Sequence, residues 1–352
     1  MNVRKILLML CLGFLINQAN ATETQMITGA GSTAAAPIYR SWASEYQAKN
    51  GVALTYESIG STAGFKKMQA GQTGFGASDI APTQADLKKD GLVMFPIAAT
   101  GISPVVNLPK IADAQLRLSG SVLGLIFLGT ITQWNDPAIV QLNPDVSLPA
   151  LAIKVVARSD GSGTTYNFSD YLAKVNPVWK EKFGVKANFP WPANFITVKG
   201  SDDMVATVKE TVGAIGYVDF SYIKGNRLHT VQLPSLEGDY VQPSASAFRI
   251  AVRNSDWSKT GNFSSTLTNM PGKGAWPITM GTFVLVPQIA SNLEQSRNVL
   301  QFFSWAFVRG DAMVQKHNFV QLPERVQAQA FNAIASVKDV SGKTMDLTLS
   351  QK

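Results

Sequence analysis

The amino-acid sequence predicts an α/β fold. Short strand-like runs alternate with helical patterns along the 352 residues, which is typical of this class. Several of the strand-like runs end in turns rich in Gly, Ser and Thr that lead directly into a helix. Hydrophobic residues make up 45% of the chain, so there is ample apolar surface to bury, and the length is enough for two or three domains of ~150 residues.

Hydrophobic spacing justifies the elements in chain order. Ile38, Trp42 and Tyr46 recur every four residues and so share one helix face, Pro37 fits the first turn of that helix, and Gly51 predicts its end. The same reasoning predicts strands at 26–28, 52–56, 75–78, 153–157, 215–218 and 283–286. It predicts helices around 37–50, 60–68, 164–172, 201–212 and 300–307, with Ser201 as the cap of the fourth.

Residues 1–21 have the pattern of a secretory signal peptide. Arg4 and Lys5 precede an apolar run over 6–16, which is too short to span a bilayer, and 19–21 reads Ala-Asn-Ala, a small-x-small cleavage site. The mature chain is therefore expected to begin at Thr22 and to be exported. Cleavage removes the only cysteine, Cys11, and lowers the formal net charge from +7 to +5.

The composition excludes several kinds of site. With one Cys and two His, zinc sites built on these residues, iron–sulfur clusters and disulfide scaffolds are nearly ruled out, and no cofactor or metal is expected. Export also argues against a need for ATP or NAD. Because Lys and Arg never form a run longer than two, a nucleic-acid partner is not expected either.

Three similar turns are the sharpest functional signal. Gly-Ser-Thr-Ala occurs at 31–34 and again at 60–63, each time between a strand and a helix, and 158–164 is a third such turn. A helix N-terminus offers free N–H groups and a partial positive charge, which suits a small oxyanion. Ser and Thr are also good helix caps, and capping alone remains the alternative for each turn.

The third turn adds charge. Arg158 offers a planar fork of donors for phosphate or carboxylate, and Asp160 could orient its guanidinium. Ser162, Gly163 and Thr164 would supply hydroxyl and N–H donors. The alternative is a surface Arg–Asp pair beside a capped helix, worth ~0–1 kcal/mol.

Asp79 directly follows the strand-like run 75–78. It could be an ordinary turn or capping residue before Pro82. A carboxylate among anion donors has a more specific use, because it accepts a hydrogen bond from an oxyanion that still carries a proton. Phosphate keeps a proton near neutral pH and sulfate does not, so such an acceptor would select phosphate.

Several segments together resemble the periplasmic phosphate-binding proteins of phosphate-specific ABC importers, along essentially the whole mature chain. The matching segments are 27–33 (Ile-Thr-Gly-Ala-Gly-Ser-Thr), 59–61 with Gly64, 75–79, 158–164, 213–218 and 275–279. The resemblance implies a two-lobed, type II binding-protein fold with two crossings of the chain between the lobes. The expected lobes are 22–100 with 277–352, and 101–276.

The resemblance also implies the ligand contacts. Carried over by position, they are Thr33, Ala34, Ser61, Asp79, Arg158 held by Asp160, Ser162, Gly163 and Thr164. The family commonly has Phe-Pro where this chain has Ala34-Ala35, which keeps the backbone N–H but thins the apolar cover of the anion. The expected function is periplasmic binding of phosphate and its delivery to importer permease subunits, by a monomer without catalytic residues.

Two alternatives come from other classes. Gly29-x-Gly31-x-x-Ala34 fits the relaxed dinucleotide-binding fingerprint, with Glu57 near the end of the next strand, as in oxidoreductases. Ser162 between two glycines could be a hydrolase nucleophile, but a serine triad needs a histidine base, and only His229 and His317 exist.

Overall fold

The computed structural model describes residues 26–345 and residue 347; the predicted signal peptide lies outside this range. Its main sheet has the strand order β2-β1-β3-β11-β4-β7-β5-β6, and β8 also pairs with β4. The strands are β1 (Met26–Gly31), β2 (Ala53–Ser58), β3 (Phe75–Ser78), β4 (Leu92–Val106), β5 (Lys154–Arg158), β6 (Ile196–Val198), β7 (Ala214–Asp219), β8 (His229–Thr230) and β11 (Thr279–Pro287). Two small sheets pair β9 (Leu233–Pro234) with β10 (Tyr240–Val241), and β12 (Ile289–Ala290) with β13 (Lys338–Asp339).

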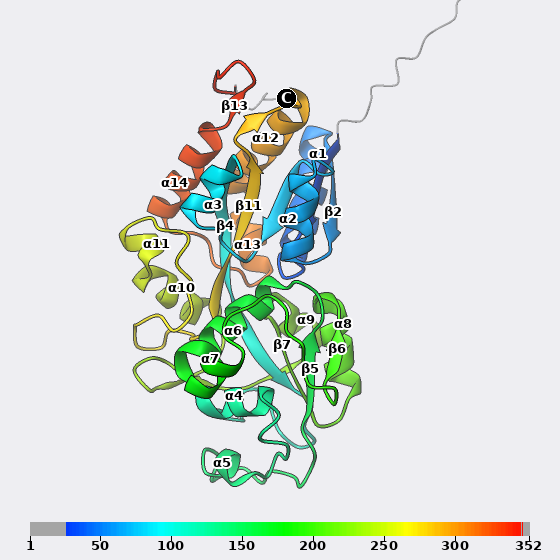
Figure 1. Ribbon diagram of the computed structural model, residues 1–352, viewed down its shortest axis with the longest axis vertical. Helices are drawn as coiled ribbons and strands as arrows, with labels where there is room; N and C mark the ends of the chain where they lie inside the picture. Colours follow the sequence, from blue (N-terminus) through cyan, green and yellow to red (C-terminus); the bar gives the residue numbers. More distant parts are fainter. Residues whose placement is uncertain (1–25, 346, 348–352) are drawn as a thin grey trace, which may run out of the picture.

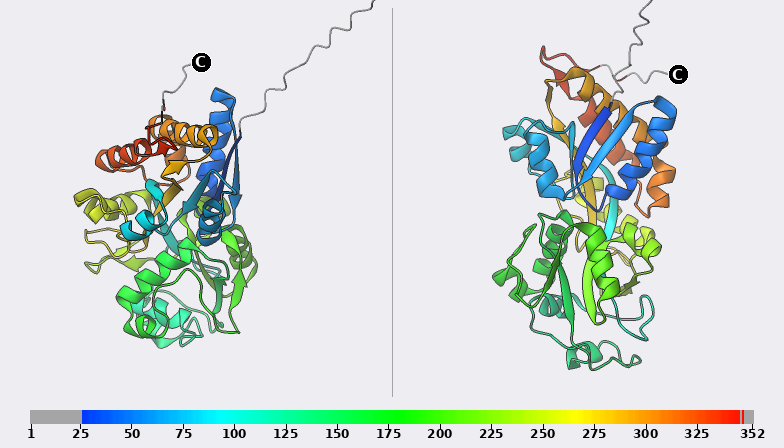
Figure 2. Two further views of the ribbon diagram at one scale, coloured as in Figure 1. Left: turned by 45° about the horizontal axis from the view of Figure 1, so that its top comes forward. Right: turned by 90° about the vertical axis from the view of Figure 1, so that its right-hand side faces the viewer.

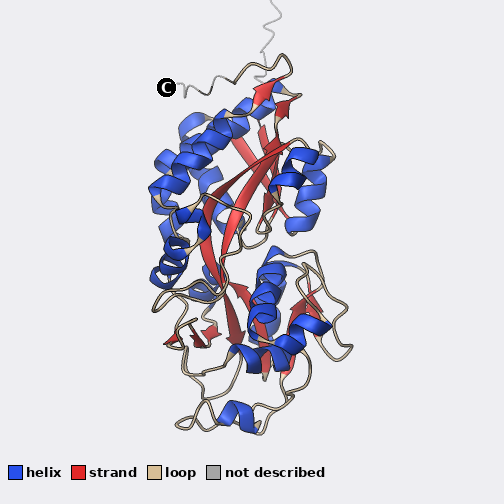
Figure 3. Cartoon of the chain, turned by 60° about the vertical axis from the view of Figure 1, so that its left-hand side comes forward, coloured by secondary structure: helices blue, strands red, loops and turns tan. Residues whose placement is uncertain are grey.

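Helices lie on both sides of the sheet (Figure 3). They are α1 (Ala36–Asn50), α2 (Ser61–Gln69), α3 (Gln84–Lys89), α4 (Gly120–Phe127), α5 (Pro137–Val140), α6 (Gly163–Val175), α7 (Pro177–Lys182), α8 (Gly200–Glu210), α9 (Ile223–Asn226), α10 (Ala245–Asn254), α11 (Asp256–Lys259), α12 (Leu293–Arg309), α13 (Asp311–Lys316) and α14 (Glu324–Ala335), with a 3-10 turn at Phe220–Tyr222. The α/β class predicted from the sequence is therefore confirmed.

The sheet is divided between two lobes (Figures 1 and 2). We call the part built on β1, β2 and β3 the first lobe and the part built on β5, β6 and β7 the second lobe. Strand β4 runs from one to the other: its residues up to Gly101 pair with β11, and those from Ile102 pair with β7. Strand β11 starts beside Gly101 and pairs with β3 and the first part of β4, so the chain has returned to the first lobe where β11 begins.

The cores follow the predicted hydrophobic faces. Ile38, Trp42 and Tyr46 of α1 are all buried, and Trp42 and Tyr46 pack edge-on against Phe302 of α12, with ring centroids 6.3 and 5.1 Å apart. Phe303 of α12 is buried as well. Burying large aromatic rings dominates core energetics, because each removes extensive apolar surface from water.

The predicted strands and helices are all present, and their ends differ by a few residues. One local expectation is wrong. Helix α8 ends at Glu210, two residues before Val212, which is 49% exposed, and its N-cap is Lys199 rather than Ser201. Ser201 is instead buried inside the first turn, where its hydroxyl makes a tertiary contact described below.

Candidate functional site

The three predicted turns meet where the lobes face each other. Strands β1, β3 and β5 point their carboxyl ends at this interface, as ligand-binding strands of open α/β sheets do. Thr62 N donates to the Gly161 carbonyl oxygen across it at 3.1 Å, and Tyr222 Oη donates to the Thr33 carbonyl oxygen at 2.8 Å. Residues 99 and 189 positions apart in the chain are thus brought into one polar cluster.

Arg158 ends β5 and is held by Asp160. Its Nε and Nη2 donate to the two carboxylate oxygens of Asp160 at 2.6 and 2.5 Å, and Gly200 N donates to Oδ1 at 3.2 Å. Burial alone would raise the pKa of Asp160, but the hydrogen bonds and charge of Arg158 bring that pKa below its ordinary value. Arg158 is only 1% exposed, so the alternative of a surface ion pair is wrong.

Asp79 follows β3 in the first lobe and is 3% exposed. Its backbone N–H donates to Ser61 Oγ at 3.1 Å, and Asn167 of α6 donates to its backbone oxygen at 2.7 Å. One carboxylate oxygen, Oδ2, accepts a hydrogen bond from Ser32, whereas Oδ1 is buried without a partner. Burial raises the pKa of Asp79 to about 6, although neighbouring hydroxyls and the charge of Arg158 lower it in part.

The remaining first-lobe candidates surround Asp79. Thr33 and Ala34 lie between β1 and α1, and both are buried. Thr33 Oγ1 is 2.9 Å from Ser201 Oγ of the second lobe. Ser61 is the first residue of α2, where the backbone N–H groups of the opening turn have no partner within the helix.

The second-lobe candidates open helix α6. Ser162 caps the helix by accepting a hydrogen bond from Thr165 N at 3.1 Å, so capping is shown, and a contact of its hydroxyl with a ligand stays a prediction. The backbone N–H of Ser162 donates to the Ala187 carbonyl oxygen at 2.9 Å. Gly163 and Thr164 follow, and Thr164 is 1% exposed.

Close approach of the lobes requires glycine at two positions. A Cβ on Gly163 would lie 2.5 Å from Ser61 Oγ and 2.6 Å from Asp79 Cβ. A Cβ on Gly60, whose φ is +92°, would lie 2.7 Å from Asp160 Oδ2. Both distances are shorter than real Cβ contacts, so a side chain at either glycine would push the lobes apart. These glycines explain why the turn sequences are rich in Gly.

All nine predicted site residues therefore fall in one cluster between the lobes. The cluster combines three helix starts, the Arg158 guanidinium and hydroxyl groups with a buried acceptor, Asp79 Oδ1. This set of groups is suited to a small, tetrahedral oxyanion that carries at least one proton. Whether each residue touches a ligand stays a prediction.

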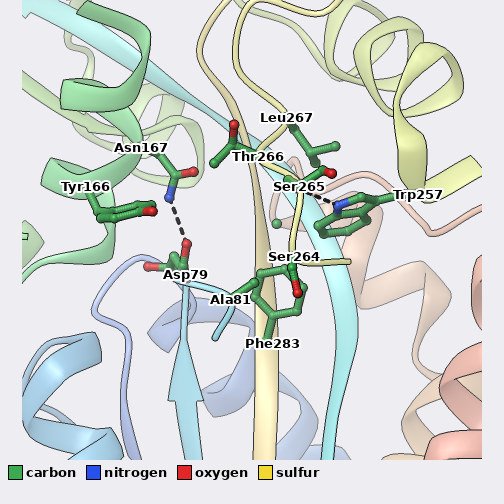
Figure 4. A pocket seen from close by; sticks show the side chains of 11 residues that line it. Asp79, Ala81, Tyr166, Asn167, Trp257, Ser264, Ser265, Thr266, Leu267 and Phe283 are labelled. Carbon is green, nitrogen blue, oxygen red and sulfur yellow. Dashed lines mark hydrogen bonds between the residues drawn. The ribbon is translucent and has the colours of Figure 1, made fainter. Parts of the chain in front are cut away.

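A small cavity of about 20 Å³ lies beside Asp79 (Figure 4). Asn167 and Tyr166 of α6 line one side of it, and Ser264 and Thr266, from the loop after α11, line another. The volume suits about one water molecule. Because Arg158, Ser162 and Thr164 do not line it, this cavity is separate from the predicted donor set.

Sequence reasoning missed three polar residues that shape the site. Ser32 donates to Asp79, Ser201 contacts Thr33, and Asn167 donates to the Asp79 carbonyl oxygen. The repeated Gly-Ser-Thr-Ala pattern pointed at the turn that holds Ser32. No local pattern pointed to the contacts of Asn167 or Ser201, because their partners lie far away in the chain.

The two alternatives from other classes are not supported. Glu57, the expected ribose ligand of a dinucleotide site, is paired with Lys67 of α2 at 2.5 Å. The hydrogen bond to Ser162 Oγ comes from Thr165 N; His229 lies in β8, beside β4, and His317 follows α13. Among the described residues, no group of three or more His, Cys, Asp and Glu side chains could hold a metal ion.

No helix within 26–345 has an apolar stretch long enough to cross a membrane.

Comparison with known proteins identifies the family. The model of the PBP superfamily domain matches residues 17–309. The chain is 40% identical over 311 residues to the phosphate-binding protein PstS of Xylella fastidiosa, covering 88% of this chain and 85% of that one. It is 42% identical over 331 residues to PstS of Pasteurella multocida, covering 93% and 95%.

Solved structures agree on the fold. A phosphate-binding protein from Stenotrophomonas maltophilia superposes with a TM-score of 0.69 at 20% identity, covering 92% of this chain and 97% of that one. A putative phosphate ABC transporter substrate-binding protein from Clostridium perfringens, solved with bound phosphate, gives 0.60 at 18% identity, covering 85% and 100%. The predicted two-lobed α/β fold is confirmed, and the chain belongs to the PBP superfamily, within the family of the PstS phosphate-binding proteins.

Proposed function

We propose that this chain binds inorganic phosphate between its two lobes. The observation that carries the proposal is the buried, unpartnered Oδ1 of Asp79 beside the Arg158 guanidinium and three helix starts. A buried acceptor without a donor is costly, and a protonated oxyanion would supply that donor. The proposed contacts are Thr33, Ala34, Ser61, Asp79, Arg158, Ser162, Gly163 and Thr164, with Asp160 holding Arg158.

Charge chemistry then gives the selectivity. Phosphate keeps a P–OH group near neutral pH and donates it to Asp79. Sulfate carries no such proton, so its negative oxygens would face the ionised carboxylate in a site closed to water. Like charges placed together cost several kcal/mol, and this repulsion excludes sulfate. Asp79 would therefore contribute to selectivity in two ways, by accepting a hydrogen bond from phosphate and by repelling sulfate.

The biological role follows from the family. The matched relatives are named phosphate-binding proteins, and one similar structure is titled as an ABC transporter substrate-binding protein. We propose that the chain acts in the periplasm after loss of residues 1–21, as a monomer and a binding protein rather than an enzyme, and passes phosphate to importer permease subunits. The lobes would be 22–100 with 277–352, and 101–276.

Titration calorimetry on residues 22–352, freed of bound anion by extensive dialysis, tests this function. Phosphate should bind tightly with one site per chain, whereas sulfate at the same concentrations should give no heat. Arsenate and a phosphate monoester, titrated in parallel, define how closely the site fits the anion. Absence of phosphate binding in a folded sample would refute the proposal.

A further inference from the structure

Ser32 is a buried residue beside the proposed site that is not among the proposed ligand contacts. It follows β1 directly, is 0% exposed, and lies one residue before Thr33. Its backbone is fixed on both sides, because its N–H donates to the Ala77 carbonyl oxygen at 2.9 Å and its carbonyl oxygen accepts from Tyr56 Oη at 2.7 Å. The hydroxyl is therefore held at one place relative to β3 and Asp79.

The hydrogen bonds of Ser32 have a defined direction. Ala35 N donates to Ser32 Oγ at 3.1 Å, which uses an acceptor position of the hydroxyl. A hydroxyl has one proton, and here it goes to Asp79 Oδ2 at 2.6 Å. That distance is typical of a hydrogen bond to an ionised carboxylate, which is stronger than one between neutral groups. Ser32 thus stabilises the charged form of Asp79.

We propose that Ser32 is a positioning residue for anion selection: by holding Oδ2 of Asp79, it leaves Oδ1 as the one acceptor for the proton of the bound anion. The inference rests on the proposed phosphate function. Ser32 touches the carboxylate and acts through it. It keeps Asp79 charged, and so able to reject sulfate, down to a lower pH than burial alone would allow.

Other ionisable groups face Asp79 from several elements. Arg158 of β5 lowers the pKa of Asp79. Burial, with a smaller contribution from Asp79, raises the pKa of Tyr39 in α1 and of Tyr56 in β2, so both tyrosines stay neutral throughout the range of interest. Asp219 at the end of β7 is buried with a pKa of about 7, raised mainly by burial and slightly by Asp79. Because the pKa of Asp219 is close to that of Asp79, an experiment must separate the titration of the two carboxylates.

Sulfate binding measured from pH 5 to pH 9 is the test, since sulfate has no proton to lose in that range. In the natural chain, sulfate should begin to bind as the pH falls below about 6, when Asp79 becomes a neutral donor. Ser32→Ala removes a hydrogen bond to a charged group, so the onset should move up by about one pH unit. Ser32→Cys, which keeps the shape with a weaker donor, should give a smaller shift.

Three controls make the outcome decisive. Ser78→Ala removes a buried hydroxyl whose bond goes to the Ile80 carbonyl oxygen, and should leave the onset unchanged. In an Asp79→Asn background, Ser32→Ala should have no further effect on the pH profile, whereas in an Asp219→Asn background the shift should persist.

The failure of the Ser32 role can be told apart from the failure of the proposed function. Loss of phosphate and sulfate affinity by the same factor at every pH, or an additional effect of Ser32→Ala on top of Asp79→Asn, would overturn the positioning role. If the natural chain binds no phosphate at all, the proposed function fails instead, whatever Ser32 does.

Discussion

Asp79 is a buried carboxylate and Asp160 a half-buried one; they lie near one guanidinium, in opposite lobes, and their pKa values shift in opposite directions. Asp160 receives two hydrogen bonds from Arg158 and one from Gly200 N, and its pKa is lowered. The carboxylate of Asp79 accepts a hydrogen bond from Ser32 at Oδ2, and Oδ1 has no partner. Burial raises the pKa of Asp79 to about 6, although Ser32, the nearby Thr282 and Ser61 hydroxyls and the charge of Arg158 lower it in part. Burial and hydrogen-bond partners, rather than residue type, set the two pKa values: Asp160 is half-buried and held by Arg158, whereas Asp79 is more deeply buried and has fewer partners.

Removing the Arg158 guanidinium, which lies near both carboxylates, should have the largest effect. Arg158→Met deletes charge-assisted hydrogen bonds to the anion and leaves Asp160 without its partner. We expect phosphate affinity to fall by about 100-fold or more, measured by calorimetry. Arg117→Met, at an exposed arginine of the same lobe, is the matched control and should bind phosphate normally. Equal losses of phosphate affinity in both variants would mean that net charge, and not the donors of the Arg158 guanidinium, attracts the anion.

Neutralising Asp79 should relax selectivity. In Asp79→Asn the carboxylate that penalises an unprotonated anion is gone, so the ratio of phosphate to sulfate affinity should drop by roughly 100-fold. Competition of sulfate against phosphate at pH 8 measures this ratio. A variant that still rejects sulfate as strongly as the natural chain would show that Asp79 does not select the anion.

The same substitution should stabilise the empty protein. Because the folded pKa of Asp79, about 6, lies above the ordinary aspartate value of 3.8, the folded state binds more protons between those pH values, and stability falls as the pH rises through them. Asp79→Asn should therefore raise the free energy of unfolding by about 3 kcal/mol at pH 8 and change it little near pH 4. Thermal unfolding of phosphate-free samples at both pH values checks this.

Asp160→Asn is the counterpart, with the opposite sign. The stability that Asp160 contributes is present above its ordinary pKa and is lost as the pH falls through its lowered folded value. The variant should therefore be less stable than the natural chain at neutral pH, with the difference shrinking in acid. If both variants moved stability in the same direction at pH 8, the contrast between the two carboxylates would be wrong.

A third carboxylate, that of Asp170, shows how much phosphate affinity depends on an ion pair that is not among the proposed ligand contacts. Asp170 of α6 pairs with Lys174 at 2.9 Å. The hydroxyl of Thr268, in the loop before β11, donates to Asp170 and accepts from Lys174. This pair is partly exposed, so it should contribute about 0.5 kcal/mol. Asp170→Asn should lower phosphate affinity less than about threefold by calorimetry. A loss as large as that of Arg158→Met would mean that packing of α6 against the loop before β11, rather than ligand donors, dominates binding.

Much of the site could be read from local patterns. The turns after β1 and β5, the start of α2 and the carboxylate after β3 all appeared as small or polar residues where a strand ends, and Arg158 and Asp160 are two residues apart. The failures concern contacts. Ser201 was expected to cap α8 but lies against Thr33, because a hydroxyl takes whichever partner the fold brings to it.

Spacings of a few residues were enough to predict the elements, their buried faces and the three turns rich in Gly, Ser and Thr. Which turns meet, and in which direction the pKa of each carboxylate shifts, followed only from the packed chain. Ser32 and Asp79 are 47 positions apart, and Thr33 and Ser201 are 168 apart. A pKa depends on burial and on the direction of every nearby hydrogen bond, and neither exists until such distant residues are packed together.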